Sequence, residues 1–351
     1  MSETDDRVSG FGSRVSGNCC QRGSLAKKVG IGAVVVGLPL GAFGIYKALE
    51  NADQGGELVP GKGISLDAAL RQVDPGLIKY KEVARIETGF SKPTAIAVDG
   101  KGDLLVGAEG MVRRFSRTGS LIGDVAVAGT VYCLAAGDGD VIYVGMKDHV
   151  EVYGGDGKML KRWESWGEKA YLTSITVAGN TVWVGDAGRR VAVRCDREGK
   201  VIGEIGKADA SKGVTGLVMP SPHLDVAVGS DGLVWVNNPG MHRVEGYRAD
   251  GQLERYWGEM GTKIEAFPGC CNPADFAVLK DGSFIVAEKV TPRVKKYGAD
   301  GTFEGVVAAP DAFGQNMMGI DVAVDGEGRV LLMERGKREV RIFVVKEEGG
   351  K

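Results

Sequence analysis

Residues 269–301 read GCCNPADFAVLKDGSFIVAEKVTPRVKKYGADG, and this stretch decides the fold. It holds short predicted strands at residues 275–279, 283–287 and 293–297, and residues 302–308 add a fourth. The turns between them, Lys280-Asp281-Gly282 and Gly298-Ala299-Asp300-Gly301, contain the residues that tight hairpins need. Strands this short, at this spacing, are typical of an all-β sandwich or a closed radial repeat.

The same unit occurs six times along the chain. The copies align on the last residue of their second strand: Val106, Val144, Val184, Val236, Val286 and Leu332. A period of roughly 40 to 50 residues with four strands per unit indicates propeller blades. The sixth copy ends without room for a fourth strand, whereas residues 81–86 alternate as a strand that has no hairpin partner. We therefore predict a six-bladed β-propeller over residues 77–351, closed by pairing the first strand with the last blade.

Several segments carry a family resemblance. They are Tyr256-Trp257-Gly258, residues 267–278, residues 221–228 and residues 236–244. Across residues 80–345 the chain resembles the NHL repeat of six-bladed propellers, most clearly in the fourth and fifth blades. The resemblance implies the fold only, because NHL-type propellers include binding scaffolds and some enzymes.

The N-terminal part has a different composition. Residues 1–28 are polar and Ser/Gly-rich, which predicts a disordered cytoplasmic tail. Residues 29–46 carry no charge and, as a helix, would span about 27 Å, enough for a bilayer core. Lys27 and Lys28 precede them, so we expect a transmembrane helix with the propeller on the extracytoplasmic (periplasmic) side and residues 47–76 as a linker. A cleaved signal peptide is the alternative.

Composition narrows the function classes. A formal net charge of -2 gives no electrostatic case for nucleic acid. The chain has only 3 histidines, which argues against a multi-histidine metal site. It contains no G-x-S-x-G, P-loop, H-E-x-x-H or C-x-x-C motif. A binding protein is therefore expected rather than an enzyme.

Candidate ligand-binding residues lie where the inner strands begin. The connections entering the last three blades, residues 205–223, 258–273 and 306–318, are long. One aligned position on the inner strand reads Ala95, Cys133, Ser174, Asp225, Asp275 and Asp321. The three carboxylates suit a hard cation such as calcium, or a polar ligand. Alternatively, each one bonds turn amides of the adjacent blade and holds the ring together.

The loop position after the second strand is the other polar set. It reads Ala108, Met146, Asp186, Asn238, Glu288 and Glu334. Asn238, Glu288, Glu334 and Asn272 are therefore candidate ligand-binding residues. Ordinary solvated loop polarity is the alternative interpretation.

The adjacent pair Cys270-Cys271 does not fit a packing pattern. His223 and Met317-Met318 lie in the neighbouring entry connections, and these soft ligands together suit Cu(I). A disulfide, within the pair or to another loop, and buried thiols remain open.

These expectations combine into one hypothesis and one alternative. The chain is expected to be a membrane-tethered propeller that binds a protein or small-molecule ligand at one face. The alternative is a metal-dependent or redox-active propeller that uses the cysteine pair, with copper or calcium as the possible metal.

Overall fold

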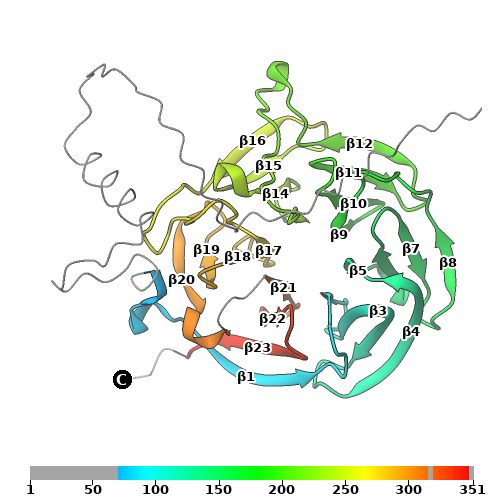
Figure 1. Ribbon diagram of the computed structural model, residues 1–351, viewed down its shortest axis with the longest axis horizontal. Helices are drawn as coiled ribbons and strands as arrows, with labels where there is room; N and C mark the ends of the chain where they lie inside the picture. Colours follow the sequence, from blue (N-terminus) through cyan, green and yellow to red (C-terminus); the bar gives the residue numbers. More distant parts are fainter. Residues whose placement is uncertain (1–69, 315–318, 348–351) are drawn as a thin grey trace, which may run out of the picture. The chain divides into compact units, whose positions relative to one another are not determined.

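The computed structural model describes residues 70–314 and 319–347. These residues form six antiparallel sheets arranged as a ring of blades (Figure 1). The predicted six-bladed β-propeller is confirmed. Blade one is β2 (Ala95–Val98), β3 (Leu104–Phe115) and β4 (Leu121–Thr130), with its second and third strands merged in β3.

The other blades have four strands each. Blade two is β5 (Cys133–Ala136), β6 (Ile142–Gly145), β7 (Val150–Tyr153) and β8 (Met159–Arg162). Blade three is β9 (Leu172–Ala178), β10 (Thr181–Asp186), β11 (Val191–Asp196) and β12 (Val201–Ile205). Blade four is β13 (Val226–Val228), β14 (Val234–Asn238), β15 (Arg243–Tyr247) and β16 (Leu253–Trp257).

Blade five is β17 (Asp275–Val278), β18 (Phe284–Ala287), β19 (Val294–Tyr297) and β20 (Phe303–Ala308). Blade six is β21 (Ile320–Val324), β22 (Val330–Glu334), β23 (Glu339–Val345) and β1 (Tyr80–Glu87). Five short 3-10 helices lie in the described connections: η1 (Pro75–Leu77), η2 (Asp138–Asp140), η3 (Ala210–Lys212), η4 (Pro239–Met241) and η5 (Pro310–Ala312).

The ring closes through β1. This strand pairs antiparallel with β23, from Tyr80 opposite Val345 to Glu87 opposite Glu339. The cyan β1 therefore lies beside the red β23 in Figure 1. The closure predicted from the unpaired strand at residues 81–86 is confirmed, and the pairing covers an edge of blade six.

Register is the same in all six blades. The residues used to align the copies lie opposite equivalent inner-strand residues: Ile96, Leu134, Ile175, Val226, Phe276 and Val322. The sequence alignment is therefore also a structural one. We call the inner-strand residue just before each of these six residues the ring position of its blade.

The core is made mainly of apolar layers between neighbouring blades. Between blades four and five, the rings of Trp257 and Tyr297 lie 4.8 Å apart, and those of Trp235 and Phe284 lie 5.0 Å apart. Such aromatic pairs add about 0.5–1.5 kcal/mol each beyond the area they bury. Packing between blades thus fixes the inner strands around the ring axis.

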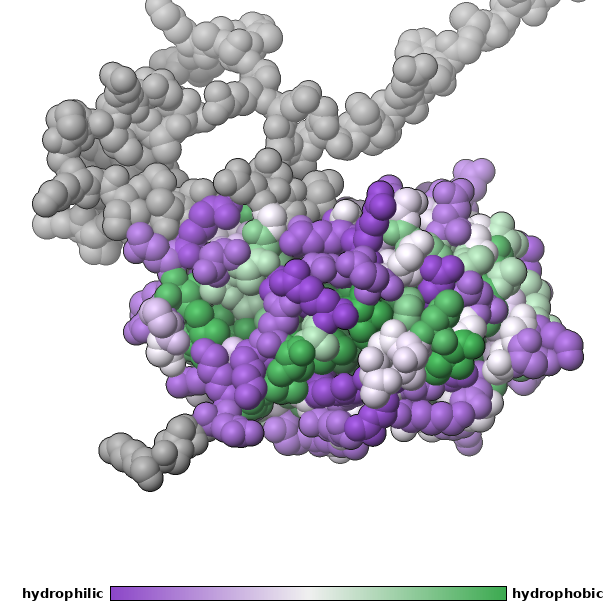
Figure 2. Space-filling model, turned by 90° about the horizontal axis from the view of Figure 1, so that it is seen from below, coloured by the Kyte–Doolittle hydropathy of each residue, from purple (hydrophilic) through white to green (hydrophobic). Residues whose placement is uncertain are grey.

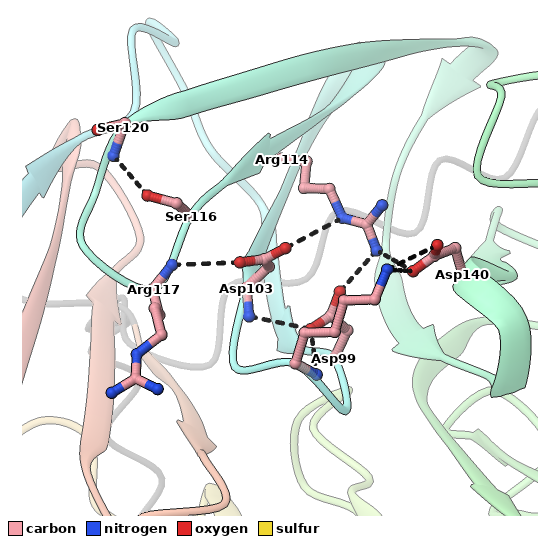
Figure 3. A network of polar contacts seen from close by, with 8 residues as sticks. Asp99, Asp103, Arg114, Ser116, Arg117, Ser120 and Asp140 are labelled. Atoms are coloured by element: carbon pink, nitrogen blue, oxygen red, sulfur yellow. Dashed lines mark hydrogen bonds and ion pairs between the residues drawn. The ribbon is translucent and has the colours of Figure 1, made fainter.

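Ion pairs join blades one and two at the turns between first and second strands. Arg114 donates to Asp99 at 2.6 Å and to Asp140 at 3.2 Å, and Lys101 also pairs with Asp140 (Figure 3). Asp99 Oδ1 accepts the backbone N–H groups of Lys101 and Asp103, each at 2.9 Å. Charges that range from the buried Asp99 to the exposed Lys101 therefore join these two blades.

Two sequence predictions concern parts of the chain outside the described residues. They are the cytoplasmic tail and membrane helix at residues 1–46, and the role of Met317 and Met318. Within the part that the structure describes, no helix is both long and apolar enough to cross a bilayer.

Figure 2, which views the ring from the side of β1, shows hydrophobic residues interspersed with hydrophilic ones.

Candidate functional site

The six inner strands surround a central channel with a cavity of about 270 Å³. Its lining includes the ring-position residues of all six blades, which brings Asp225, Asp275 and Asp321 into one space. These strands begin at one face, which we call the entry face. The loops between second and third strands lie at the same face, because Asp321 is opposite Met333 and Asp275 is opposite Ala287.

The ring-position aspartates join neighbouring blades. Asp225 Oδ2 accepts the N–H of Phe276 at 2.8 Å, and Asp275 Oδ1 accepts that of Val322 at 3.1 Å. Asp321 Oδ2 accepts the N–H of Ile96 at 2.8 Å, across the closure. The donors are inner-strand amides and not the turn amides that we expected. Each donor lies one residue beyond the ring position of the next blade.

Asp275 has spare hydrogen-bonding capacity. Among the described residues it accepts one hydrogen bond, at Oδ1, which leaves Oδ2 for a ligand. Burial, followed by the charges of Asp225 and Asp321, raises its pKa well above the ordinary value. Burial also raises the pKa of Asp225, to about 6, and that of Asp321. Mutual repulsion in a site of low polarity favours the protonated forms.

Cations from blades five and six lie near this carboxylate group. The positive charge of Arg335 lowers the pKa of both Asp275 and Asp321, against the larger effect of burial. Burial, together with the charges of Lys289 and Arg335, lowers the pKa of His223 to about 3. His223 is therefore neutral at physiological pH, and it shares the entry face with two cations.

Arg335 differs from most of the buried or half-buried arginines. Its guanidinium makes no hydrogen bond or ion pair with another residue in the described ranges, whereas Arg293 and Arg341 bond carboxylates. Its backbone is held, because its N–H donates to the carbonyl of Gly319 at 3.2 Å. The charge of Arg335 acts on Asp275, Asp321 and His223, so its side chain lies at the entry face, with its donors unused among the described residues.

The blade-two and blade-three side of the entry face is aromatic. Tyr132 directly precedes Cys133 and lines the channel, while Tyr171 directly precedes β9. Their ring centroids are 5.2 Å apart at an interplanar angle of 78°. Both side chains are only partly buried, so this edge-to-face pair offers a flat surface with hydroxyl groups.

The predicted loop-position residues are engaged within their own blades. Asp186, Asn238 and Glu288 are each 0% exposed, so they are not the solvated loop groups of the alternative interpretation. Asp186 Oδ1 accepts the N–H of Tyr171 at 3.0 Å, and Asn238 Oδ1 accepts that of Val218 at 2.9 Å. In this way both hold an entry connection.

The remaining two polar loop residues form ion pairs. Glu288 lies 2.6 Å from Arg293 and 2.8 Å from Lys295, and Glu334 lies 2.9 Å from Lys337. Together with Asp186 and Asn238, these residues bond the loops and connections of the entry face.

The structure shows no S–S bond within the cysteine pair. The Sγ atoms of Cys270 and Cys271 lie 3.2 Å apart, and Cys270 is exposed. Cys133 and Cys195 are buried free thiols, and burial raises the pKa of Cys195 to about 12. Within the described residues, no three or more His, Cys, Asp or Glu side chains are grouped to hold a metal ion.

Sequence reasoning missed four residues of the entry face: Tyr132, Tyr171, Lys289 and Arg335. Lys289 and Arg335 stand one residue beyond the loop position, where the six blades read Glu109, Lys147, Ala187, Pro239, Lys289 and Arg335. Extending the alignment by one column would have found both cations.

No protein-family model and no curated protein matches this chain. Several solved structures are similar to this chain. A streptogramin B lyase has a TM-score of 0.53 at 11% identity, with 78% of this chain and 100% of that chain covered. A virginiamycin B lyase from Staphylococcus aureus has a TM-score of 0.53 at 12% identity, with 76% of this chain and 100% of that chain covered. A protein of unknown function from Bacteroides thetaiotaomicron has a TM-score of 0.55 at 14% identity, with 76% of each chain covered. At these identities the likeness shows the six-bladed β-propeller fold alone.

Proposed function

We propose that this chain is a binding propeller whose entry face takes a small organic acid at the mouth of the central channel. The observation that carries the proposal is the guanidinium of Arg335, whose charge acts on Asp275 and Asp321 and whose donors are unused within the described residues. A guanidinium matches a carboxylate in planar, bidentate geometry, and such charge-assisted bonds are about twice as strong as neutral ones. A carboxylate is therefore the group expected there.

The neighbouring side chains define the rest of the ligand. Lys289 adds a second positive charge, while the free oxygen of Asp275 accepts from a hydroxyl or ammonium group. The raised pKa values of the three aspartates favour their protonated forms, which reduces their repulsion of an anion. The ligand class is accordingly a hydroxy- or amino-substituted carboxylate.

The size of the space favours a small ligand. The channel cavity of about 270 Å³ lies just below the range of about 300–1,000 Å³ that is usual for drug-sized ligands. Tyr132 and Tyr171 present ring surface on the other side of the mouth. An acid with a short carbon skeleton fits both the polar and the aromatic side.

The N-terminal segment completes the proposal. Residues 29–46, preceded by Lys27 and Lys28, would tether the propeller and place it on the extracytoplasmic side. A tethered binding propeller would then capture its ligand outside the cytoplasm. The lyase activity named for two similar structures is not carried over, because the likeness extends to the fold alone.

Titration calorimetry with malate, a hydroxydicarboxylate, tests the proposal. We expect saturable binding that Arg335→Ala weakens at least about tenfold, a loss of about 1.4 kcal/mol. Arg338→Ala, an exposed arginine in the same loop, is the matched control and should bind as the wild type does. Succinate, which lacks the hydroxyl, should bind more weakly, and glycerol should not bind.

Two outcomes would refute the proposal. One is the absence of saturable binding for malate and succinate alike. The other is binding that Arg335→Ala and Arg338→Ala weaken equally, since this would indicate general charge attraction.

A further inference from the structure

The entry connection of blade five places two thiols next to a buried hydrogen-bonded amide. Cys270 and Cys271 have their Sγ atoms 3.2 Å apart, and Cys270 is exposed to solvent. The next residue, Asn272, is 3% exposed. A solvent-accessible dithiol thus adjoins a side chain that is fixed in the interior.

Asn272 bonds the loop that carries Lys289. Its Oδ1 accepts the N–H of Lys289 at 2.9 Å, and its Nδ2 donates to the carbonyl of Lys289 at 3.2 Å. The same Nδ2 also donates to the carbonyl of Pro268 at 2.8 Å. One amide therefore ties the cysteine-bearing connection to both sides of the Lys289 peptide.

Lys289 reaches the entry face from this clamp. Its Nζ donates to the hydroxyl of Ser221, in the blade-four connection, and its charge helps to lower the pKa of His223. The following residue, Val290, has a φ of 74° and is 70% exposed, a strained conformation for a β-branched residue. The loop is therefore held in place by its partners and not by its own backbone preference.

We propose that Cys270 and Cys271 form a reversible dithiol–disulfide site whose redox state sets the position of Lys289 through Asn272. A disulfide requires an S–S distance of about 2.05 Å, so closure draws the two sulfur atoms more than 1 Å closer. That movement occurs one residue from Asn272, whose three hydrogen bonds leave it little room. Closure consequently loosens the bond between Asn272 and the Lys289 N–H.

The reaction needs a low-molecular-weight disulfide as oxidant. The thiolate of one cysteine attacks a sulfur of that disulfide, which forms a mixed disulfide and releases one thiol. The second cysteine then attacks the protein sulfur of the mixed disulfide and releases the second thiol. The protein loses two electrons and two protons, and the oxidant is reduced to two thiols.

Two measurements on the full chain test this inference, with oxidised glutathione as the oxidant. Mass mapping of the peptide that carries Cys270 and Cys271 should show the loss of two hydrogens and of both thiols, with no glutathione adduct retained. Hydrogen exchange of a peptide covering residues 288–293 should become several-fold faster after oxidation and return to its first rate after reduction. The variant with Cys270→Ser and Cys271→Ser should show neither change.

The outcomes separate this inference from the proposed function. Only the effect of the redox state on ligand binding rests on the proposed function. A stable glutathione adduct, or no reaction, would overturn the dithiol site. Closure with unchanged exchange at residues 288–293 would overturn the coupling to Lys289. Neither measurement reports on ligand binding at the channel mouth, so a failure to bind malate would leave this inference intact.

Discussion

Val290 shows strain at a single residue of the entry face. Its φ of 74° lies in the left-handed region, which costs an L-residue roughly 1–2 kcal/mol, and more when the side chain is β-branched. The side chain is 70% exposed and contributes little packing in return. Strained residues of this kind gather at functional sites, and Val290 adjoins Lys289.

Replacing Val290 should therefore stabilise the propeller. Val290→Gly is expected to raise the free energy of unfolding by up to about 1 kcal/mol, because glycine adopts positive φ without strain. Urea denaturation measures the change. Val201→Gly, on the exposed strand β12, is the control and should lower stability instead. Equal losses in the two variants would contradict the strain argument.

At the scale of elements, a buried lysine fixes the entry connection of blade five. Lys295 on β19 is 0% exposed, and its Nζ donates to the carbonyls of Ile264 and Ala266 at 3.0 and 2.9 Å. The ammonium also lies 2.8 Å from Glu288 and 4.6 Å from the ring centre of Phe267. Burial lowers its pKa to about 8, but these partners hold the charge in place.

Removing this charge should detach the connection. Lys295→Met leaves Glu288 and two carbonyls short of a donor, and breaking a buried pair costs about 3–5 kcal/mol. Thermal denaturation should show a large fall in Tm, and limited proteolysis should cut residues 258–273 faster. The neighbouring Lys296→Met breaks a half-exposed pair with Glu304 and should cost less than about 1 kcal/mol. Similar losses in the two variants would refute the anchoring role.

The charged third strand β19 was only partly predicted from the sequence. Turn residues and apolar alternation predicted the strands of blade five within a residue of their observed ends. They did not predict that the third strands bury charge. Arg113, Lys295 and Arg341 each donate to a carbonyl of their own blade's entry connection. A charged residue within a strand pattern normally indicates a solvated face, and only the folded connection supplies the carbonyls.

At the scale of the whole propeller, sequence reasoning predicted the blade count, the closure and the set of ring-position residues. It left open whether the aspartates bind a ligand or join the blades, because both roles use the same residues. The structure shows the hydrogen bonds between blades. The cations at the mouth were missed, since Lys289 and Arg335 resemble ordinary loop charges until the ring brings them near the aspartates.

The ring of buried carboxylates makes the stability of the propeller depend on pH. The pKa of Asp225 is raised to about 6, and those of Asp275 and Asp321 are also raised. Between their ordinary and raised pKa values, the folded state therefore binds more protons than the unfolded state. The free energy of unfolding must then fall as pH rises through this window, from about 4 to beyond 6. At neutral pH these carboxyl groups carry negative charge that burial disfavours, whereas in acid they are protonated and the penalty disappears.

Asp275→Asn isolates this effect, because the asparagine Oδ1 still accepts the N–H of Val322 while the charge is lost. The variant should be more stable than the wild type at pH 8 and nearly equal to it at pH 4. Urea denaturation at pH 4, 6 and 8 measures the slopes, with the exposed Asp311→Asn as the control of unchanged slope. A wild-type slope in Asp275→Asn would mean that the buried carboxylates do not govern the pH dependence.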